Sequence, residues 1–289
     1  MDPVKRSLGM LHLTMILLGG TALFSKIIPL SSTDITFGRS VVACLLLALV
    51  VKFTEGSLRL RNRRDYVIAI GLGMLMAAHW VTYFAAMQYS SVSVGMIALF
   101  TFPVITVLIE PFFEKISLVW QDLVSALVVF MGIVLMVPEI SLENDVTLGI
   151  VIGVASAILY AFRNLCHRRY FCQYSGARAM AYQTAVIIAS LYFFTSDEIF
   201  TASTETYIWL LLLGTVFTAL PHAMIASSLK HLRAKTFSLV ACMQPFYGVV
   251  LAVLILDESP TWQTLVGGTL VISAAIYETV NAQKLHQKT

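Results

Sequence analysis

Ten long apolar segments, separated by short polar stretches, follow one another along the whole chain. They cover residues 8–30, 34–53, 66–88, 92–113, 118–137, 146–166, 176–195, 206–228, 236–256 and 261–282. Each has about the 20 residues that an α-helix needs to cross the hydrocarbon core of a bilayer. None alternates between apolar and polar residues as a strand of a membrane barrel does. The pattern therefore predicts an all-α membrane protein with ten transmembrane helices, because helices satisfy their own backbone groups in lipid.

Lys and Arg residues fall almost entirely on one side of the predicted bundle. With ten spans, 17 of the 19 Lys and Arg residues lie on the side that also carries both termini. The opposite loops hold no Lys or Arg but contain acidic residues such as Asp197 and Glu258. Because cationic residues accumulate in short cytoplasmic loops, this asymmetry predicts that both termini are cytoplasmic. The two remaining cations, Lys26 and Arg39, lie inside predicted spans.

Composition excludes several classes of protein. The chain has 289 residues, of which 58% are hydrophobic and 12% charged, against about 25% charged in soluble proteins. Ten spans leave no room for a soluble catalytic domain, and no Walker loop or HExxH motif is present, so we expect neither an enzyme nor a cofactor. A net charge of +3 gives no basic excess for nucleic acid. The four scattered cysteines lack the paired spacing of a zinc site, so no metal is expected either.

The two halves of the chain match each other at a constant offset of 142 residues. The offset pairs Pro103 with Pro245, Trp120 with Trp262, Gln121 with Gln263, and Lys26 with Arg168. Each half has five spans, and an odd number of spans turns the second half upside down in the membrane. We therefore predict two inverted repeats, residues 1–141 and 142–289. Inverted repeats are typical of secondary transporters, whose substrate site lies near the bilayer midplane between the halves.

Three stretches of the sequence resemble a known family. They are AAMQYSSVSVGMIALFTFPVITVLIEPFFEKISLVWQ, TFGRSVVACLLLAL with Arg39, and LDESPTWQTLVGGTLV. Together with the repeat they are similar to the ten-helix drug/metabolite transporter superfamily, EamA type, over essentially the whole chain. The resemblance implies a secondary transporter that exports a small metabolite. It also implies a cavity walled by helices one, three, four, six, eight and nine, with helices five and ten at the periphery. One departure is Glu258, which has Ile116 and no acidic residue at the matching position of the first half.

Polar side chains in the third and eighth spans are the first candidates for a substrate site. A polar group in hydrocarbon is costly unless it faces the interior of the bundle. His79, Trp80 and Tyr83 lie within one helical turn, and the offset places His222 at the position of Trp80. We predict that these four residues line the pocket. The alternative is that each histidine only satisfies a polar group of a neighbouring helix.

Prolines in the fourth and ninth spans form a second group of candidates. Pro103 and Pro245 each remove a backbone donor, so they predict a kink or gate in the helix. A kink that serves packing alone is equally compatible with the pattern. Beside them, Thr101 and Gln244 offer polar groups, and we expect both to contact substrate.

The sixth and first spans supply the remaining candidates for binding. Tyr160 and Asn164 share one helical face with Arg163 beside them, and Phe24 adds an aromatic residue at the matching level of the first span. We predict that all four contact substrate. Arg163 would neutralise a carboxylate, although its place near the cytoplasmic end also fits a side chain that extends to the interface.

Two charged residues raise the questions of coupling and gating. Glu110 is the candidate for proton coupling if it is buried, because burial favours the protonated form of a carboxyl group. An interfacial Glu110 is the alternative, since Pro111 follows it. For Arg39, the match to the family implies a structural or gating ion pair with Asp34 or with an acidic residue of an outer loop. The alternative is that its side chain extends to the membrane interface.

These observations predict a transporter of the bacterial inner membrane that carries a small amphipathic metabolite, such as an amino acid, by alternating access. The sequence is equally compatible with coupling to protons, exchange against a second substrate, and a uniporter. Small-residue stripes at Gly149 and Gly153 and at Gly267 and Gly268 suggest helix packing or a homodimer. The rival functions are a nucleotide or nucleotide-sugar carrier, which requires more cations in the cavity, and a lipid scramblase, which requires a groove open to lipid.

Overall fold

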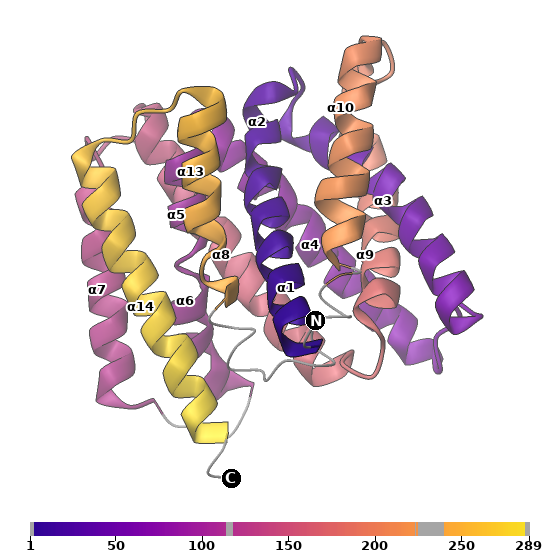
Figure 1. The fold of residues 1–289 in the computed structure, drawn as a ribbon, viewed down its shortest axis with the longest axis horizontal. Helices are drawn as coiled ribbons and strands as arrows, with labels where there is room; N and C mark the ends of the chain where they lie inside the picture. The colour runs from indigo at the N-terminus through magenta and orange to yellow at the C-terminus, as the bar shows by residue number, and fades with distance from the viewer. Residues whose placement is uncertain (1–2, 114–117, 223, 225–239, 287–289) are drawn as a thin grey trace.

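A computed structural model describes residues 3–113, 118–222, 224 and 240–286 of the chain. All regular structure in these residues is helical (Figure 1). The first half contains α1 (Pro3–Gly20), η1 (Thr21–Leu23), α2 (Phe24–Ile27), α3 (Ser32–Glu55), α4 (Arg63–Tyr89), α5 (Val92–Leu99), α6 (Phe102–Ile109), η2 (Glu110–Phe112) and α7 (Trp120–Met136). The second half contains α8 (Asp145–Tyr170), α9 (Gly176–Leu191), η3 (Tyr192–Phe194), η4 (Asp197–Ile199), α10 (Thr204–Gly214), η5 (Thr215–Ala219), α13 (Gln244–Leu256) and α14 (Trp262–His286).

The predicted spans correspond to these helices. Within the described residues, six helical segments are long and apolar enough to cross a membrane: Ser7–Ile27, Ser32–Glu55, Arg63–Tyr89, Val92–Phe112, Asp145–Tyr170 and Thr204–His222. Shorter apolar helices, α7 and α13, occupy the fifth and ninth predicted spans. The start of the ninth predicted span, before residue 240, lies outside the described residues. The predicted all-α architecture of two inverted five-helix repeats is confirmed.

Polar residues at the helix ends explain where several helices begin and end. Ser31, Ser91 and Ser203 each precede a helix, and the hydroxyl oxygen of each accepts a hydrogen bond from a backbone N–H of the first turn. Such side chains satisfy the N–H groups that the first turn leaves without partners. At the other end of α3, Gly56 has a φ of 75°, a left-handed conformation that glycine adopts without strain.

Both matched prolines stand where a helix is interrupted. In the fourth span, α5 ends at Leu99 and α6 starts at Phe102, so that Pro103 occupies the first turn of the new helix. Pro245 occupies the first turn of α13 in the same way. A proline is well tolerated there because those backbone N–H groups have no partner within the helix. The interruption predicted from the sequence is therefore present in both halves.

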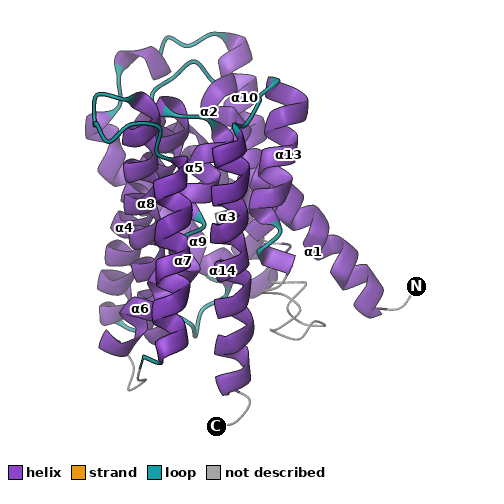
Figure 2. Cartoon of the chain, turned by 90° about the vertical axis from the view of Figure 1, so that its left-hand side faces the viewer, coloured by secondary structure: helices purple, strands orange, loops and turns teal. Residues whose placement is uncertain are grey.

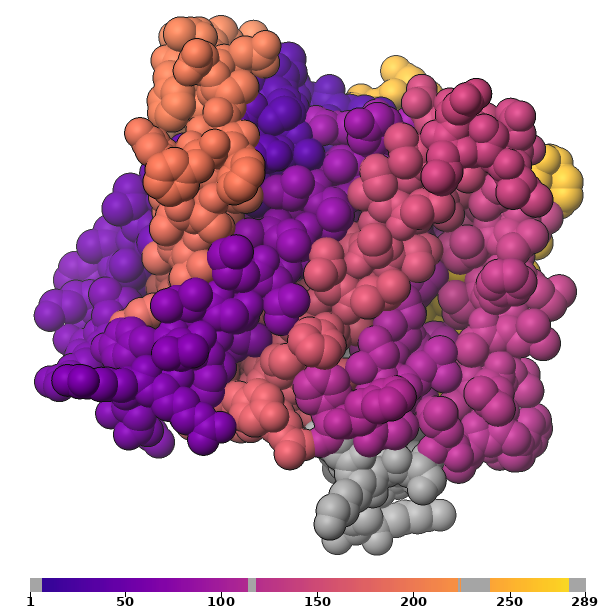
Figure 3. All heavy atoms as spheres, turned by 180° about the vertical axis from the view of Figure 1, so that it is seen from behind, coloured from indigo at the N-terminus to yellow at the C-terminus, as the bar shows by residue number. Residues whose placement is uncertain are grey.

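Helices of the two halves pack against each other in matched pairs. The pairs α4 with α8, α3 with α9, and α7 with α14 are in contact, and α13 lies against α1 as α5 and α6 lie against α8. Segments of the first and second half therefore lie side by side on the rear face of the molecule (Figure 3). In the side view the helices run along the long direction of the bundle, and α1 begins at the end where α14 finishes (Figure 2).

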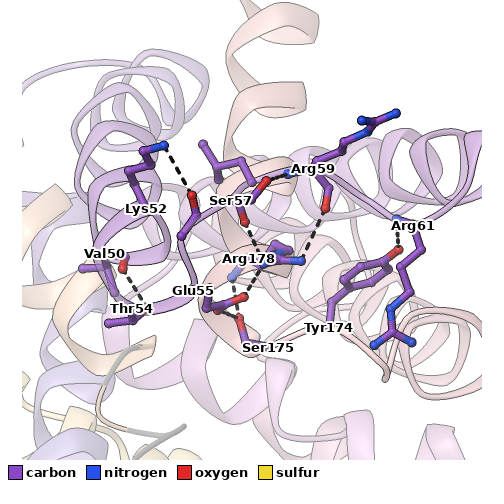
Figure 4. A network of polar contacts seen from close by, with 12 residues as sticks. Val50, Lys52, Thr54, Glu55, Ser57, Arg59, Arg61, Tyr174, Ser175 and Arg178 are labelled. Atoms are coloured by element: carbon purple, nitrogen blue, oxygen red, sulfur yellow. Dashed lines mark hydrogen bonds and ion pairs between the residues drawn. The ribbon is translucent and has the colours of Figure 1, made fainter.

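At this end of the bundle, two connections from different halves are joined. The Arg178 guanidinium forms an ion pair of 2.7 Å with Glu55 and donates to the carbonyl of Ser57 at 2.7 Å (Figure 4). The Tyr174 phenol donates to Asp65 at 2.5 Å and accepts from the Arg61 N–H at 2.8 Å. Burial, and then the hydrogen bond to Asp65, raise the pKa of Tyr174. These contacts place the cation-rich α3–α4 and α8–α9 connections on the same side, as the charge pattern predicts.

Candidate functional site

A cavity of about 470 Å³ lies between the two halves of the bundle. Both halves contribute to its lining, which consists of Met15, Leu18, Thr21, Arg39, Met76, His79, Trp80, Tyr83, Leu99, Phe100, Phe102, Pro103, Thr106, Val107, Glu110, Tyr160, Arg168, Phe217, His222, Ala241, Cys242, Gln244, Glu278 and Thr279. A volume of this size falls within the range of pockets that hold small organic molecules.

The six helices expected to wall the cavity all contribute to it. Two further helices also take part, since α3 supplies Arg39 and α14 supplies Glu278 and Thr279. The tenth helix is therefore not wholly peripheral. No described residue of α7 or α9 lines the cavity, which fits the expected peripheral place of the fifth helix.

Aromatic and imidazole rings form one wall of the cavity. The rings of His79 and Tyr160 stack with centroids 4.6 Å apart, and Tyr83 lies on the same stack at 6.1 Å from His79. Phe102 meets the Tyr160 ring edge-on at 4.9 Å. These residues come from α4, α8 and α6, so the wall joins both repeats. It offers flat apolar surfaces with a few polar atoms at their edges.

Hydrogen bonds to backbone carbonyls fix both histidines. Nδ1 of His79 lies 2.8 Å from Oγ of Ser156 and 3.2 Å from the Ser156 carbonyl, and the Ser156 hydroxyl donates to the carbonyl of His79 at 2.9 Å. Nδ1 of His222 lies 2.7 Å from the carbonyl of Thr218. A carbonyl only accepts, so Nδ1 carries the proton in each ring and Nε2 is left as an acceptor in the neutral form. Each histidine therefore both forms a hydrogen bond to a neighbouring group and lines the cavity.

The backbone at His222 is shaped by a wider helical turn. Residues Thr215–Ala219 form a π-helical turn, in which the Thr218 hydroxyl donates to the Leu213 carbonyl at 2.7 Å. This turn brings the Phe217 side chain into the cavity lining. Single π turns within helices are frequent at functional sites, because they redirect the side chains that follow.

Arg39 lies in the cavity lining and does not pair with Asp34. The Asp34 carboxylate accepts hydrogen bonds from the Ser31 hydroxyl and from the N–H and hydroxyl of Ser196, at 2.7 to 3.0 Å. The guanidinium of Arg39 instead stacks on Trp80, with Cζ 3.6 Å from the ring centroid. The expected ion pair between Arg39 and Asp34 is therefore absent from the structure.

Charged side chains mark the end of the cavity nearest the termini. Glu110 accepts from Arg168, whose side chain is 44% exposed, so the cavity lining reaches the surface there. Glu278 of α14 is 3% exposed, and its Oε1 has no hydrogen-bond partner among the described residues. Sequence reasoning passed over Glu278 because it lies near the end of the last helix, where a polar residue is expected to reach the interface.

Five of the predicted site residues lie outside the lining. Arg163 donates to Oε1 of Gln183 on α9 and to Oδ1 of Asn164, so both residues are engaged between α8 and α9. Phe24 packs against Phe217 with ring centroids 4.9 Å apart. Thr101 is buried and bonded to the Ala98 carbonyl, and Pro245 is buried at the start of α13. The other predicted site residues all border the cavity: His79, Trp80, Tyr83, Pro103, Glu110, Tyr160, His222 and Gln244.

The opposite end of the bundle is closed by polar contacts, one set between the halves and one within the first half. Oε1 of Glu258 accepts from the Val92 N–H at 2.7 Å, at the start of α5. The ammonium of Lys26 donates to the carbonyls of Gln88 and Ser90 at 3.0 and 3.1 Å. We refer to these bonds of Lys26 and Glu258 as the far-side closure. None of these residues belongs to the cavity lining, so the described cavity extends toward the end of the termini.

Comparison with known proteins decides the family of this inverted-repeat fold. The sequence profile of the EamA-like transporter family matches the chain twice, at residues 6–137 and 147–277. The chain belongs to the EamA-like transporter family. The two matches correspond to the two repeats, so each half of this EamA-like transporter carries the family pattern.

Two relatives of this EamA-like transporter are themselves described as transporters. It is 24% identical over 271 residues to the uncharacterized transporter YxxF of Bacillus subtilis strain 168, covering 91% of this chain and 86% of the relative. It is 22% identical over 267 residues to an uncharacterized transporter of Archaeoglobus fulgidus, covering 91% and 93%. A solved crystal structure matches the fold with a TM-score of 0.62 and 16% identity, over 96% of this chain and 98% of that one. The chain is therefore a multi-pass membrane protein of a transporter family.

Proposed function

We propose that this EamA-like transporter moves a small amphipathic organic solute across the bacterial inner membrane by alternating access, with both termini in the cytoplasm. The observation that carries the proposal is the cavity of about 470 Å³ between the two inverted halves. The cavity combines the stacked rings of His79 and Tyr160 with the polar groups of Gln244 and Thr279. Amino acids and related metabolites have this mixture of apolar surface and hydrogen-bonding groups. Export is the direction implied by the resemblance to EamA-type exporters.

The positions of the closed and open ends support alternating access. In the far-side closure Glu258 joins the halves at one end, and the exposed Arg168 lies in the lining at the other. With the termini in the cytoplasm, this is the arrangement of an inward-facing carrier. Because Lys26 and Arg168 are equivalent in the repeat, one residue of the pair lies at each end of the bundle, as expected if the repeats exchange roles during transport.

The rival functions predict different linings. A nucleotide-sugar carrier needs several cations for its phosphates, whereas the lining contains Arg39 and an Arg168 that is bonded to Glu110. A lipid scramblase needs a polar groove that runs along the membrane face. The stacked aromatic wall favours a compact organic solute over both.

For coupling, we propose that a carboxyl group of the cavity takes up and releases a proton during transport. Glu110 was the candidate from the sequence, and its carboxylate is already engaged in an ion pair with Arg168. Glu278 is more deeply buried, and one of its carboxylate oxygens has no partner among the described residues. Glu278 is therefore the better candidate. Glu278→Gln should remove the dependence of transport on a pH gradient, while Glu205→Gln, on an exposed helix start, should leave it intact.

Transport in reconstituted liposomes tests the proposal. Liposomes that contain the purified protein would be loaded with, or exposed to, labelled amino acids, aromatic carboxylic acids, nucleotides and amines. The movement of a fluorescent lipid would be followed in the same vesicles. Saturable movement of an organic solute, absent from empty liposomes, is the expected result. Movement of labelled lipid without movement of any soluble solute would reject the proposal in favour of a scramblase.

A further inference from the structure

Arg39 is a buried cation without a counter-ion among the described residues. Its side chain is 3% exposed, and Nε and Nη1 make no hydrogen bond in the structure. An arginine stays protonated in proteins, and a guanidinium inside a membrane span is costly unless it is paired. Among the described residues, the positive charge of Arg39 is thus left without an ion pair.

None of the acidic side chains described above pairs with Arg39. Asp34 lies on the same helix, but its oxygens are bonded to Ser31 and Ser196. Glu110 is bonded to Arg168. Glu278 lies in the cavity lining on α14, and no ion pair joins it to Arg39. An anion that balances Arg39 would therefore have to come from the contents of the cavity.

Two aromatic rings lie against the guanidinium of Arg39, and neither of them accepts a hydrogen bond from its buried Nε and Nη1. Cζ of Arg39 lies 3.6 Å from the Trp80 ring centroid and 5.1 Å from that of Phe84. These contacts are attractive, and they hold the plane of the guanidinium in place. The N–H groups of a guanidinium lie in its plane, where a carboxylate binds with two parallel hydrogen bonds.

Tyr83 provides a second unused donor in the same region. Its hydroxyl is buried and has no hydrogen-bond partner among the described residues, and Tyr83 lines the cavity together with Arg39 and Trp80. A buried hydroxyl without a partner is uncommon, because the loss of its hydrogen bonds to water is not compensated. A carboxylate has enough acceptor sites for both the guanidinium and the phenol.

We propose that Arg39 and Tyr83, with Trp80 as the supporting ring, form a subsite for the carboxylate group of an organic substrate with an apolar or aromatic body. The proposal rests on the transport function proposed above and names the class of its substrate. The body would lie against the apolar lining supplied by residues such as Met76, Leu99 and Phe217. A single guanidinium stacked on the Trp80 ring suits a carboxylate better than a phosphate, which is normally bound by several cations or backbone N–H groups.

Binding of matched acids and amides to the full-length protein in nanodiscs tests the subsite. The probes are 3-phenylpropionate with 3-phenylpropionamide, and L-phenylalanine with L-phenylalaninamide; phenyl phosphate and chloride test other anions. We expect at least one acid to bind about tenfold or more tightly than its amide, since a hydrogen bond to a charged group has that order of effect. Arg39→Gln should abolish the preference, Arg39→Lys should retain part of it, and Tyr83→Phe should reduce it several-fold. Arg59→Gln, in an exposed loop, should leave it unchanged.

The outcomes separate this inference from the proposed function. Equal binding of acid and amide, a preference that survives in Arg39→Gln, or tighter binding of phenyl phosphate would overturn the carboxylate subsite. If Arg39→Gln does not fold, the acid-to-amide ratios of the wild type and of Tyr83→Phe decide the question. Transport of amines or neutral solutes without carboxylates would reject the subsite while leaving the solute transporter in place. Movement of lipid alone would reject the transporter itself.

Discussion

Glu258 binds Ser93 through both of that residue's donors: Oε2 accepts from the Ser93 N–H at 3.1 Å and from its hydroxyl at 2.8 Å. The two residues belong to different repeats. Since Val92 donates to the other oxygen, the carboxylate from the second half occupies the N-terminus of α5 in the first half. A negative charge at a helix start is favourable because the first N–H groups and the helix dipole both point toward it. This contact therefore stabilises the closed state of one end.

Replacing this carboxylate should shift the protein toward opening at the far side. Glu258→Gln removes the charge from three hydrogen bonds, so we expect the open state to gain a several-fold population. Cys242 lines the cavity and serves as the reporter once Cys44, Cys166 and Cys172 are replaced by Ser. A membrane-impermeant maleimide applied from the side opposite the termini should label Cys242 several-fold faster in Glu258→Gln. Glu205→Gln on the same side is the control, and an unchanged labelling rate in Glu258→Gln would contradict the role of the closure.

The bond between His79 and Ser156 should contribute to stability. Ser156→Ala leaves Nδ1 of His79 with the longer contact to the Ser156 carbonyl only, so we expect a loss of about 1 kcal/mol in the free energy of unfolding. Ser190→Ala is the control because its hydroxyl bonds only within its own helix, to Ile187. Thermal unfolding in one detergent compares the two variants. Equal effects would show that the hydrogen bond between His79 and Ser156 adds nothing to stability.

Close approach of α8 to α4 should depend on the absence of a side chain at Gly149. A methyl group at this position would lie 2.6 Å from Cβ of Ser90 and 2.8 Å from the Ala86 carbonyl. We expect Gly149→Ala to destabilise the protein by about 1–3 kcal/mol, because backbone has to move. Gly71→Ala, where nothing lies within 4 Å, should be neutral or slightly stabilising. Thermal melts that rank the two variants in the opposite order would rule out the packing argument.

Tyr174 should make stability depend on alkaline pH. Its raised pKa means that the folded state holds the phenol proton more tightly than the unfolded state does. The contribution is complete below the unfolded pKa of about 10 and is lost as the pH rises toward the folded pKa. Tyr174→Phe should therefore lower the free energy of unfolding at pH 8 by about 1–3 kcal/mol and flatten its decline above pH 10. Tyr170→Phe is the exposed control, and denaturant titrations from pH 8 to 11 provide the measurement.

The spans were predictable because length and apolarity are properties of a segment by itself. Breaks at Pro103 and Pro245 follow from local backbone chemistry in the same way. Which residue a side chain contacts cannot be predicted from one segment, because the contact depends on how the other helices pack. Arg163 illustrates this: its sequence position allows contact with a substrate or with the interface, yet it is bonded to Gln183 on α9. A polar Gln183 within the seventh span was the signal that could have identified this pairing.

Arg39 also shows that closeness in sequence does not determine which residue a side chain contacts. Asp34 lies five residues before it, close enough in sequence to suggest an ion pair, but Asp34 is bonded to Ser196 after α9. Only the packed structure reveals that Arg39 stacks on Trp80 and is left without an acid among the described residues. The cavity histidines were easier to predict, because an imidazole inside an apolar span has few roles.

In the far-side closure, most of the atoms that Lys26 and Glu258 bind belong to the main chain. Lys26 binds the carbonyls of Gln88 and Ser90, and Glu258 binds the N–H groups of Val92 and Ser93. These main-chain partners are present whatever side chains this segment carries, and the Ser93 hydroxyl is the one side-chain donor added to them. Apart from Ser93 and the Ser91 cap, the segment can therefore vary in sequence without loss of these main-chain bonds, as long as its backbone keeps its path. Relatives with unlike sequences between α4 and α5 could thus close by the same bonds.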